Sequence, residues 1–167
     1  GALSLASDFV RGAAPQLQEL DMSYCQMQTR GFQRLLHGIK VANLSSLSRL
    51  NVRGNDIGSR GMDTLSVMLN LTIFENLSII DLRDNELGDA GADKIIHMCL
   101  FGLLENVTDL NLSNNMITDT GFEALVNVFS ASQPEKCPKL QRLGISNNPV
   151  KPETKKRLDP FPMFIQP

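Results

Sequence analysis

Arginine and acidic side chains recur at matching positions of similar segments, and their spacing could support ionic recognition. Arg53 and Arg83 lie 30 residues apart in the segments LNVRGND and IDLRDNE. A guanidinium group offers planar, paired donors that fit a carboxylate. Such a pair could bind an acidic partner, unless Asp21, Asp81 and Asp84 neutralise it within the chain.

The other residue types that could do chemistry do not form a catalytic pattern. His37 and His97 share one repeat position two units apart, which places them about 16–20 Å apart and excludes a single shared metal ion. The sequence has no phosphate-binding glycine loop and no nucleophile elbow. We therefore expect no enzymatic activity, no metal and no cofactor.

The three cysteines are an odd set without CxxC spacing. Cys25 replaces a turn asparagine, while Cys99 and Cys137 occupy apolar positions of their units, so we expect three buried thiols. Unpaired thiols favour a reducing compartment and predict a cytoplasmic location. Five glycosylation sequons point the other way, but the motif arises easily by chance in a chain rich in Asn and Ser. They begin at Asn43, Asn70, Asn76, Asn106 and Asn111.

An internal repeat must position these side chains. Similar segments begin at Leu17, Leu47, Leu77, Val107 and Leu140, the first four 30 residues apart and the last after 33. Each segment alternates apolar and polar residues with period two, as in a strand with one buried face. Apolar residues then recur at i, i+3, i+4 and i+7, for example over 32–39, which predicts a helix.

Each unit carries two further markers. A side chain that can cap a helix stands two residues before a repeated glycine, so we expect each helix to begin there. These capping residues are Thr29, Ser59, Asp89 and Asp119, and the glycines, Gly31, Gly61, Gly91 and Gly121, indicate either close backbone approach or an unusual dihedral angle. Turn asparagines are expected to satisfy free backbone groups as a stacked polar spine. They are Asn55, Asn85, Asn115 and Asn148.

Strands stack about 4.8 Å apart whereas helices need about 8–10 Å, so the units must form an arc with the strands inside. The pattern LxxLxLxxN, followed by an apolar site and GxxxL, resembles leucine-rich repeats of the ribonuclease-inhibitor-like class over almost the whole chain. Ribonuclease inhibitor, the Ran GTPase-activating protein, tropomodulins and NOD-like receptor repeats are cytosolic members. The resemblance implies an α/β solenoid with a curved parallel sheet on the concave face and helices on the convex face.

Length and composition agree with one repeat array. The 167 residues are 42% apolar and 20% charged, with a net charge of −2 that supplies no basic stripe for nucleic acid. The longest nearly apolar stretch, 95–104, is too short to cross a bilayer, and the first residues do not read as a signal peptide.

We interpret 1–167 as a single domain belonging to a larger protein. Residues 1–16 match the helical half of a repeat whose strand is missing, which leaves an edge open to self-association. Residues 151–167 are a cap or a linker. As a cap, Phe161, Met163, Phe164 and Ile165 would cover the last unit.

Side chains that alternate with the buried strand positions must face the concave surface. They form a mixed-charge surface, which we interpret as the docking site of a non-catalytic protein-binding scaffold, with an acidic partner. The alternatives are mutual neutralisation in solvent, a regulator that acts in trans on a small GTPase, and an actin-filament capping module. The candidate partner-binding residues are Glu19, Asp21, Tyr24, Arg49, Asn51, Arg53, Asp81, Arg83, Asp84, Asp109, Asn111 and Arg142.

Overall fold

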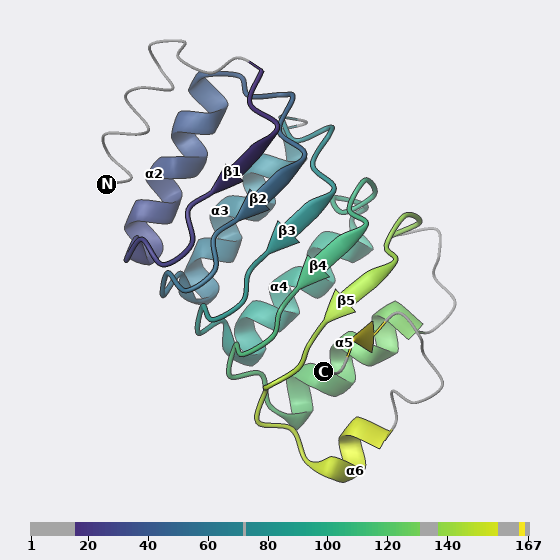
Figure 1. The fold of residues 1–167 in the computed structure, drawn as a ribbon. Helices are drawn as coiled ribbons and strands as arrows, with labels where there is room; N and C mark the ends of the chain where they lie inside the picture. Colours follow the sequence, from purple (N-terminus) through teal and green to yellow (C-terminus); the bar gives the residue numbers. More distant parts are fainter. Residues whose placement is uncertain (1–15, 72, 131–136, 157–163, 166–167) are drawn as a thin grey trace.

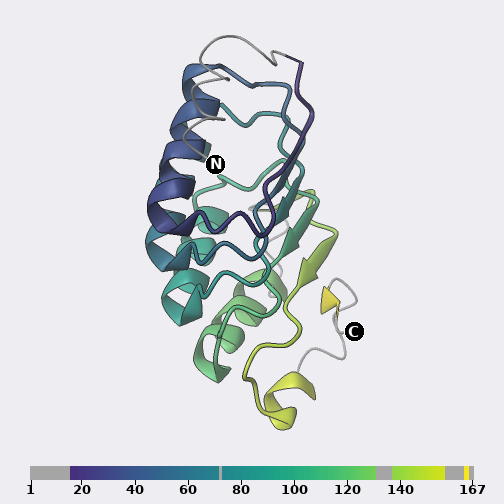
Figure 2. The ribbon, with the colours of Figure 1, turned by 60° about the vertical axis from the view of Figure 1, so that its left-hand side comes forward.

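The computed structural model describes residues 16–71, 73–130, 137–156 and 164–165, and it confirms the alternation of strand and helix. Six parallel strands form one sheet in chain order. Helices lie on the convex side and strands on the concave side of a curved array (Figures 1 and 2), as the α/β solenoid requires. The strands are β1 (Glu19–Asp21), β2 (Arg49–Asn51), β3 (Ile79–Asp81), β4 (Asp109–Asn111), β5 (Arg142–Gly144) and β6 (Phe164–Ile165).

The four long helices begin and end at the same repeat positions to within one residue. Their apolar faces pack against the sheet. Phe32, Leu35 and Ile39 are fully buried in the first helix, and in the fourth Leu125 is fully buried and Phe122 almost so. The central residue of each strand from β1 to β5 is buried between the sheet and these helices. Strand and helix residues together form one continuous core. The helices are α2 (Gln28–Val41), α3 (Gly58–Asn70), α4 (Gly88–Leu100), α5 (Asp119–Ser130) and the short α6 (Pro152–Lys155).

The prediction that each capping side chain starts its own helix is wrong for α2, α3 and α4, whereas α5 does begin at the predicted residue, Asp119. Helices α2, α3 and α4 already begin one residue earlier, and their N-cap residues make no side-chain cap. Asp89 instead accepts hydrogen bonds from Thr118 N–H (2.8 Å) and Gly121 N–H (3.2 Å), at the start of the next helix. Asp119 likewise accepts from Lys151 N–H, just before α6. Asp89 and Asp119 therefore cap the helix of the following repeat, whereas Thr29 Oγ1 donates to the carbonyl oxygen of Ile57, the N-cap residue of α3.

The repeated glycines are needed for close approach. A Cβ atom added to Gly91 would lie 2.5 Å from Leu87 Cβ, and one on Gly121 would lie 2.9 Å from Ile117 Cγ2. Neither glycine has a left-handed φ angle. Of the two explanations left open by the sequence, the structure selects tight packing of the first helical turn on the preceding buried residue.

The asparagine spine is confirmed, and it links successive repeats. Asn85 Oδ1 accepts from the backbone N–H groups of Asn55 (3.1 Å) and Ile57 (3.4 Å), in the preceding turn. Its Nδ2 donates to the carbonyl oxygens of Val52 and Leu82, both at 3.0 Å. Asn55, Asn115 and Asn148 make the equivalent bonds, and all four side chains are buried.

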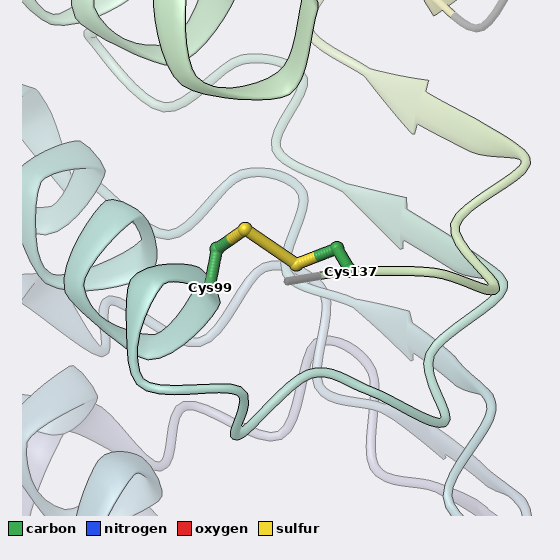
Figure 3. Close-up of a disulfide and its surroundings, with 2 residues drawn as sticks. All are labelled: Cys99 and Cys137. Carbon is green, nitrogen blue, oxygen red and sulfur yellow. A yellow bond between two sulfur atoms is a disulfide. The ribbon is translucent and has the colours of Figure 1, made fainter. Parts of the chain in front are cut away.

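The expectation of three buried thiols is wrong. Cys99, near the end of α4, and Cys137, before β5, are buried but joined by a disulfide (Figure 3), with their Cα atoms 5.8 Å apart. Cys25 is a free thiol, and it is exposed. The sequence argument placed Cys99 and Cys137 in separate apolar columns and did not consider that these columns touch across neighbouring repeats.

The two ends are only partly described. Residues 1–15 lie outside the described part, so the partial first repeat is not visible. Phe161 and Met163 of the expected cap also lie outside it. Strand β6 does pair in parallel with β5, Leu143 opposite Phe164 and Gly144 opposite Ile165.

Candidate docking surface on the concave face

The strand register places the charged columns side by side. Glu19, Arg49, Ile79, Asp109 and Arg142 form one row across the sheet, and the neighbouring row contains Asp21, Asn51, Asp81, Asn111 and Gly144. Both rows belong to the concave side because the residue between them on each strand is buried. The sheet therefore brings most of the predicted docking residues to one face.

Arg53 is held by a cluster that spans four repeats. Its Nε donates to Asp84 Oδ2 at 2.5 Å, and its guanidinium carbon lies 5.3 Å from the centre of the Tyr24 ring. Tyr24 Oη donates to the same Asp84 oxygen at 3.3 Å, and Asn114 Nδ2 donates to the other. Although Tyr24 is 61% exposed, its ring covers Gly54, where an added Cβ would collide with it. Tyr24, Arg53, Asp84 and Asn114 thus form one ordered group, here called the Asp84 cluster.

Arg83 is held by a different carboxylate. Its Nε lies 3.0 Å from both oxygens of Asp81, and its Nη2 lies 2.5 Å from Oδ2. Hydrogen bonding to Asp81 raises the pKa of Arg83. Arg142 pairs with Asp109 in the same way, through Nε. Three of the four predicted arginines are therefore neutralised by partners within the chain, as one of the alternatives expected.

Burial and hydrogen bonding compete at the aspartates. Burial raises the pKa of Asp84, but hydrogen bonds from Asn114 and Arg53 outweigh it and leave that pKa below its usual value. The pKa of Asp109 is lowered in the same manner, burial being outweighed by Arg142 and Thr108. At Asp21, hydrogen bonds from the side chain and backbone of Ser23 lower the pKa. These carboxylates are consequently ionised at neutral pH and fixed in orientation.

The arginine anchoring leaves donors unused. Among the described residues, no hydrogen-bond partner contacts either Nη atom of Arg53 or the Nη1 atom of Arg83. The two side chains remain 34% and 36% exposed. Each aspartate therefore fixes one edge of a guanidinium group and leaves outer N–H groups available to a ligand.

A hollow of about 350 Å³ lies beside these donors. Ser113 and Ser146, whose hydroxyl groups are 2.9 Å apart, lie in its wall, and a second hollow of about 230 Å³ adjoins it at Asn111 and Gly144. Gly144 creates this space because the other residues of its row carry larger side chains. The Asn111 amide lies over Gly144, and its Oδ1 would be 2.6 Å from a Cβ atom added there. The wall of the larger hollow is made by Arg53, Arg83, Asp84, Asn111, Ser113, Asn114, Gly144, Ser146 and Asn147.

Two predicted residues make no ion pair with the described residues, although the Arg49 charge adds to the hydrogen bonds that lower the pKa of Asp21 and of Asp109. Glu19 and Arg49 are exposed and have no ion-pair partner in the described part of the chain. Conversely, sequence reasoning missed Asn114 and Asn147, which line the larger hollow. The signal was present, since they share the repeat position of Tyr24 and Asp84, and all four adopt a left-handed φ of 53–56°.

The chain belongs to the leucine-rich repeat family, because a family model described as Leucine Rich repeat matches residues 14–36, 43–66, 75–95 and 104–126, more than half of the chain. The repeats are of the ribonuclease-inhibitor-like class. Among solved structures, the chain is similar to the one titled leiomodin-1 actin-binding site 2. The TM-score is 0.55 and the sequence identity 21%, over 74% of this chain and 67% of that one, which is a likeness of fold. No curated protein matches the sequence.

The described residues contain neither a membrane-spanning helix nor a metal-binding cluster. None of their helices is long and apolar enough to cross a membrane. They also contain no group of three or more His, Cys, Asp or Glu side chains able to hold a metal ion.

Proposed function

We propose that this chain is a non-catalytic protein-binding module that docks an acidic segment of its partner on the concave face. Family membership supports a role in protein interaction. The observation that carries the finer proposal is the pair Arg53 and Arg83, each fixed by an aspartate, each with outer N–H groups that make no hydrogen bond in the described part of the chain, and both in the wall of one hollow. Preorganised guanidinium donors lose little conformational freedom when they meet a carboxylate.

The mixed charge of the face shapes the expected binding. Asp81 and Asp84 lie beside the arginines, so a partner carboxylate must be placed at the outer N–H groups and kept away from these two side chains. Glu19 and Arg49 are free to pair with complementary charges at the rim of the same face. We therefore expect selective, salt-sensitive docking, because exposed ion pairs are screened over about 8–10 Å.

Actin is the first partner to test. The leiomodin-1 structure with a similar fold is, by its title, an actin-binding site. Cosedimentation with actin filaments and a filament-end elongation assay would compare the parent chain with Arg53→Glu/Arg83→Glu. We expect binding to the parent and at least a tenfold loss in the double variant.

The chain offers a matched control. Arg30 and Arg60 also occupy one repeat position in neighbouring units, but they lie exposed on the helices. Arg30→Glu/Arg60→Glu changes the net charge equally and should bind like the parent. Circular dichroism checks that each variant is folded.

If actin does not bind, affinity capture with the same three baits identifies proteins that the parent and the Arg30/Arg60 variant retain and the Arg53/Arg83 variant loses. A captured partner that binds the Arg53/Arg83 variant as tightly as the parent contradicts docking at this site.

The alternative of a regulator in trans is tested by GTP hydrolysis with candidate small GTPases. Arg53 and Arg83 would then have to leave their aspartates to reach the nucleotide.

We also propose a cytoplasmic location. The exposed free thiol of Cys25 fits a reducing compartment, whereas a disulfide is rare there. If the chain is cytoplasmic, we expect Cys99 and Cys137 to be reduced in cells. Alkylation under non-reducing conditions, followed by mass spectrometry, would then find both thiols alkylated. Quantitative pairing in freshly alkylated cells, or glycans on the sequons, would contradict this location.

A further inference from the structure

A second surface lies away from the concave face, along the edge where the helices end. Val41, Leu71 and Phe101 stand 30 residues apart, each at the C-terminal end of a helix or directly after it. They are 51%, 43% and 76% exposed. Figure 1 shows that the helix-to-strand connections of α2, α3 and α4 follow one another along one edge of the array. These three side chains form an apolar row, here called the rim strip.

The rim strip has opposite charges at its two ends. Lys40 precedes Val41 and is exposed, whereas Glu75 and Glu105 follow Leu71 and Phe101 and are also exposed. No ion-pair partner of these three residues occurs in the described part of the chain. The strip is therefore positive at its first repeat and negative at its second and third.

A hollow of about 180 Å³ lies between the two acidic connections. Glu75 and Glu105 line it together with apolar side chains, among them Phe74 and Leu103. Acidic groups at the mouth and an apolar wall suit the aliphatic stem and the ammonium group of a lysine. No lysine of the described part of this chain lines the hollow.

We propose that the rim strip is the contact surface for a second copy of this chain, packed antiparallel about a two-fold axis near Leu71. In that arrangement Leu71 meets its counterpart, and Val41 of each copy meets Phe101 of the other. Lys40 of each copy enters the hollow between Glu75 and Glu105 of the other. Reversal of the strip thus pairs apolar groups with apolar groups and positive with negative.

The repeat itself argues for this occupant. The three apolar side chains are separated by the spacing of packed helices, about 8–10 Å, and a second copy presents the same spacing. When two copies pack antiparallel, the positive end of each strip faces the negative end of the other. In a parallel arrangement, like charges would face each other. Three side chains per copy make a small contact, so the dimer belongs to the weak, concentration-dependent class.

The test is sedimentation velocity of the purified Cys25→Ser chain over a concentration series from about 10 µM to about 1 mM without reductant, so that no disulfide forms at position 25 and the Cys99–Cys137 disulfide stays intact. We expect a reversible monomer–dimer equilibrium. Leu71→Ser/Phe101→Ser should weaken it at least tenfold. Met116→Ser removes an apolar side chain of intermediate exposure (60%, against 43% for Leu71 and 76% for Phe101) from the strand-to-helix edge and should leave the equilibrium unchanged.

Charge exchange tests the orientation. Lys40→Glu alone and Glu75→Lys/Glu105→Lys should each weaken the dimer, and their combination should restore it to within about threefold of the parent. A chain that stays monomeric at the highest concentration overturns the proposal. The proposal is also overturned if Met116→Ser weakens the dimer as much as Leu71→Ser/Phe101→Ser does. It is overturned as well if the combined charge variant dimerises no more tightly than Lys40→Glu or Glu75→Lys/Glu105→Lys. Concave docking is unaffected by these variants, because none of them touches Arg53 or Arg83.

Discussion

At the scale of single residues, buried amides hold the turns in place. Asn85 serves two N–H groups and three carbonyl oxygens, so its replacement leaves several buried backbone groups unpaired. We expect Asn85→Ala to lower the free energy of unfolding by roughly 1–3 kcal/mol. Urea denaturation measures this. Asn76→Ala is the control, since Asn76 is exposed and donates a single hydrogen bond to Ser45, and an equal urea midpoint for both variants would contradict the spine model.

The concave aspartates predict how stability responds to acid. The pKa values of Asp21, Asp84 and Asp109 are lowered in the folded chain, so the unfolded chain binds more protons below about pH 4. Their contribution to stability is present above the unfolded pKa and is lost as the pH falls through the folded pKa. Asp84→Asn removes one of these groups and should reduce the fall in urea midpoint between about pH 6 and pH 3. An unchanged pH dependence would show that Asp84 is not paired in solution.

Much of the residue-scale description could be predicted. The asparagine spine followed from position and chemistry alone, and the register of the charged rows followed from the period of two. What the sequence left open was which charge pairs with which. Arg53 has aspartates in its own and neighbouring repeats as candidates, and the choice of Asp84 depends on Tyr24 and Asn114, side chains from two other units.

At the scale of elements, helix capping passes from one repeat to the next. Asp89 binds Thr118 N–H, Thr118 Oγ1 and Gly121 N–H, so it stabilises the start of α5 and not that of its own helix. We expect Asp89→Ala to cost about 1–2 kcal/mol and to speed amide hydrogen exchange at the start of α5. Asp93→Ala, an exposed change on the same helix, is the control. Faster exchange at the start of α4 in place of α5 would refute capping across repeats.

This capping pattern also shows why the sequence misled. A hydrogen-bonding residue near the first turn of a predicted helix fits an N-cap of that helix, and helix ends read from sequence are uncertain by a residue or two. The stacking of units brings the same side chain equally close to the next helix. Periodicity identifies equivalent positions, but it does not say whether a contact stays within a unit or crosses to its neighbour.

At the scale of the whole molecule, the Cys99–Cys137 disulfide ties the end of α4 to the chain that enters β5. It closes a loop with a sequence separation of 38, for which loop-closure entropy suggests about 3–4 kcal/mol of stabilisation. We expect Cys99→Ser/Cys137→Ser to melt at a lower temperature than the parent under oxidising conditions, and the two to differ much less in dithiothreitol. Calorimetry gives the melting temperatures. Cys25→Ser is the control, because Cys25 is exposed and unpaired.

The asparagine spine gives the array a direction. Each turn from the first to the fourth receives its acceptor oxygen from the unit that follows it, as Asn148 serves Asn115 N–H and Ile117 N–H. Deletion of the first unit would leave every remaining turn with its asparagine oxygen, although Asn55 Nδ2 would lose the Met22 carbonyl and Ser48 N–H and Arg49 N–H would lose that of Gln18. Deletion of the last unit would remove the Asn148 oxygen from two buried donors in the fourth turn. Shortening the array from its amino end should therefore be tolerated better than shortening it from its carboxyl end, although both deletions remove one strand and one set of contacts.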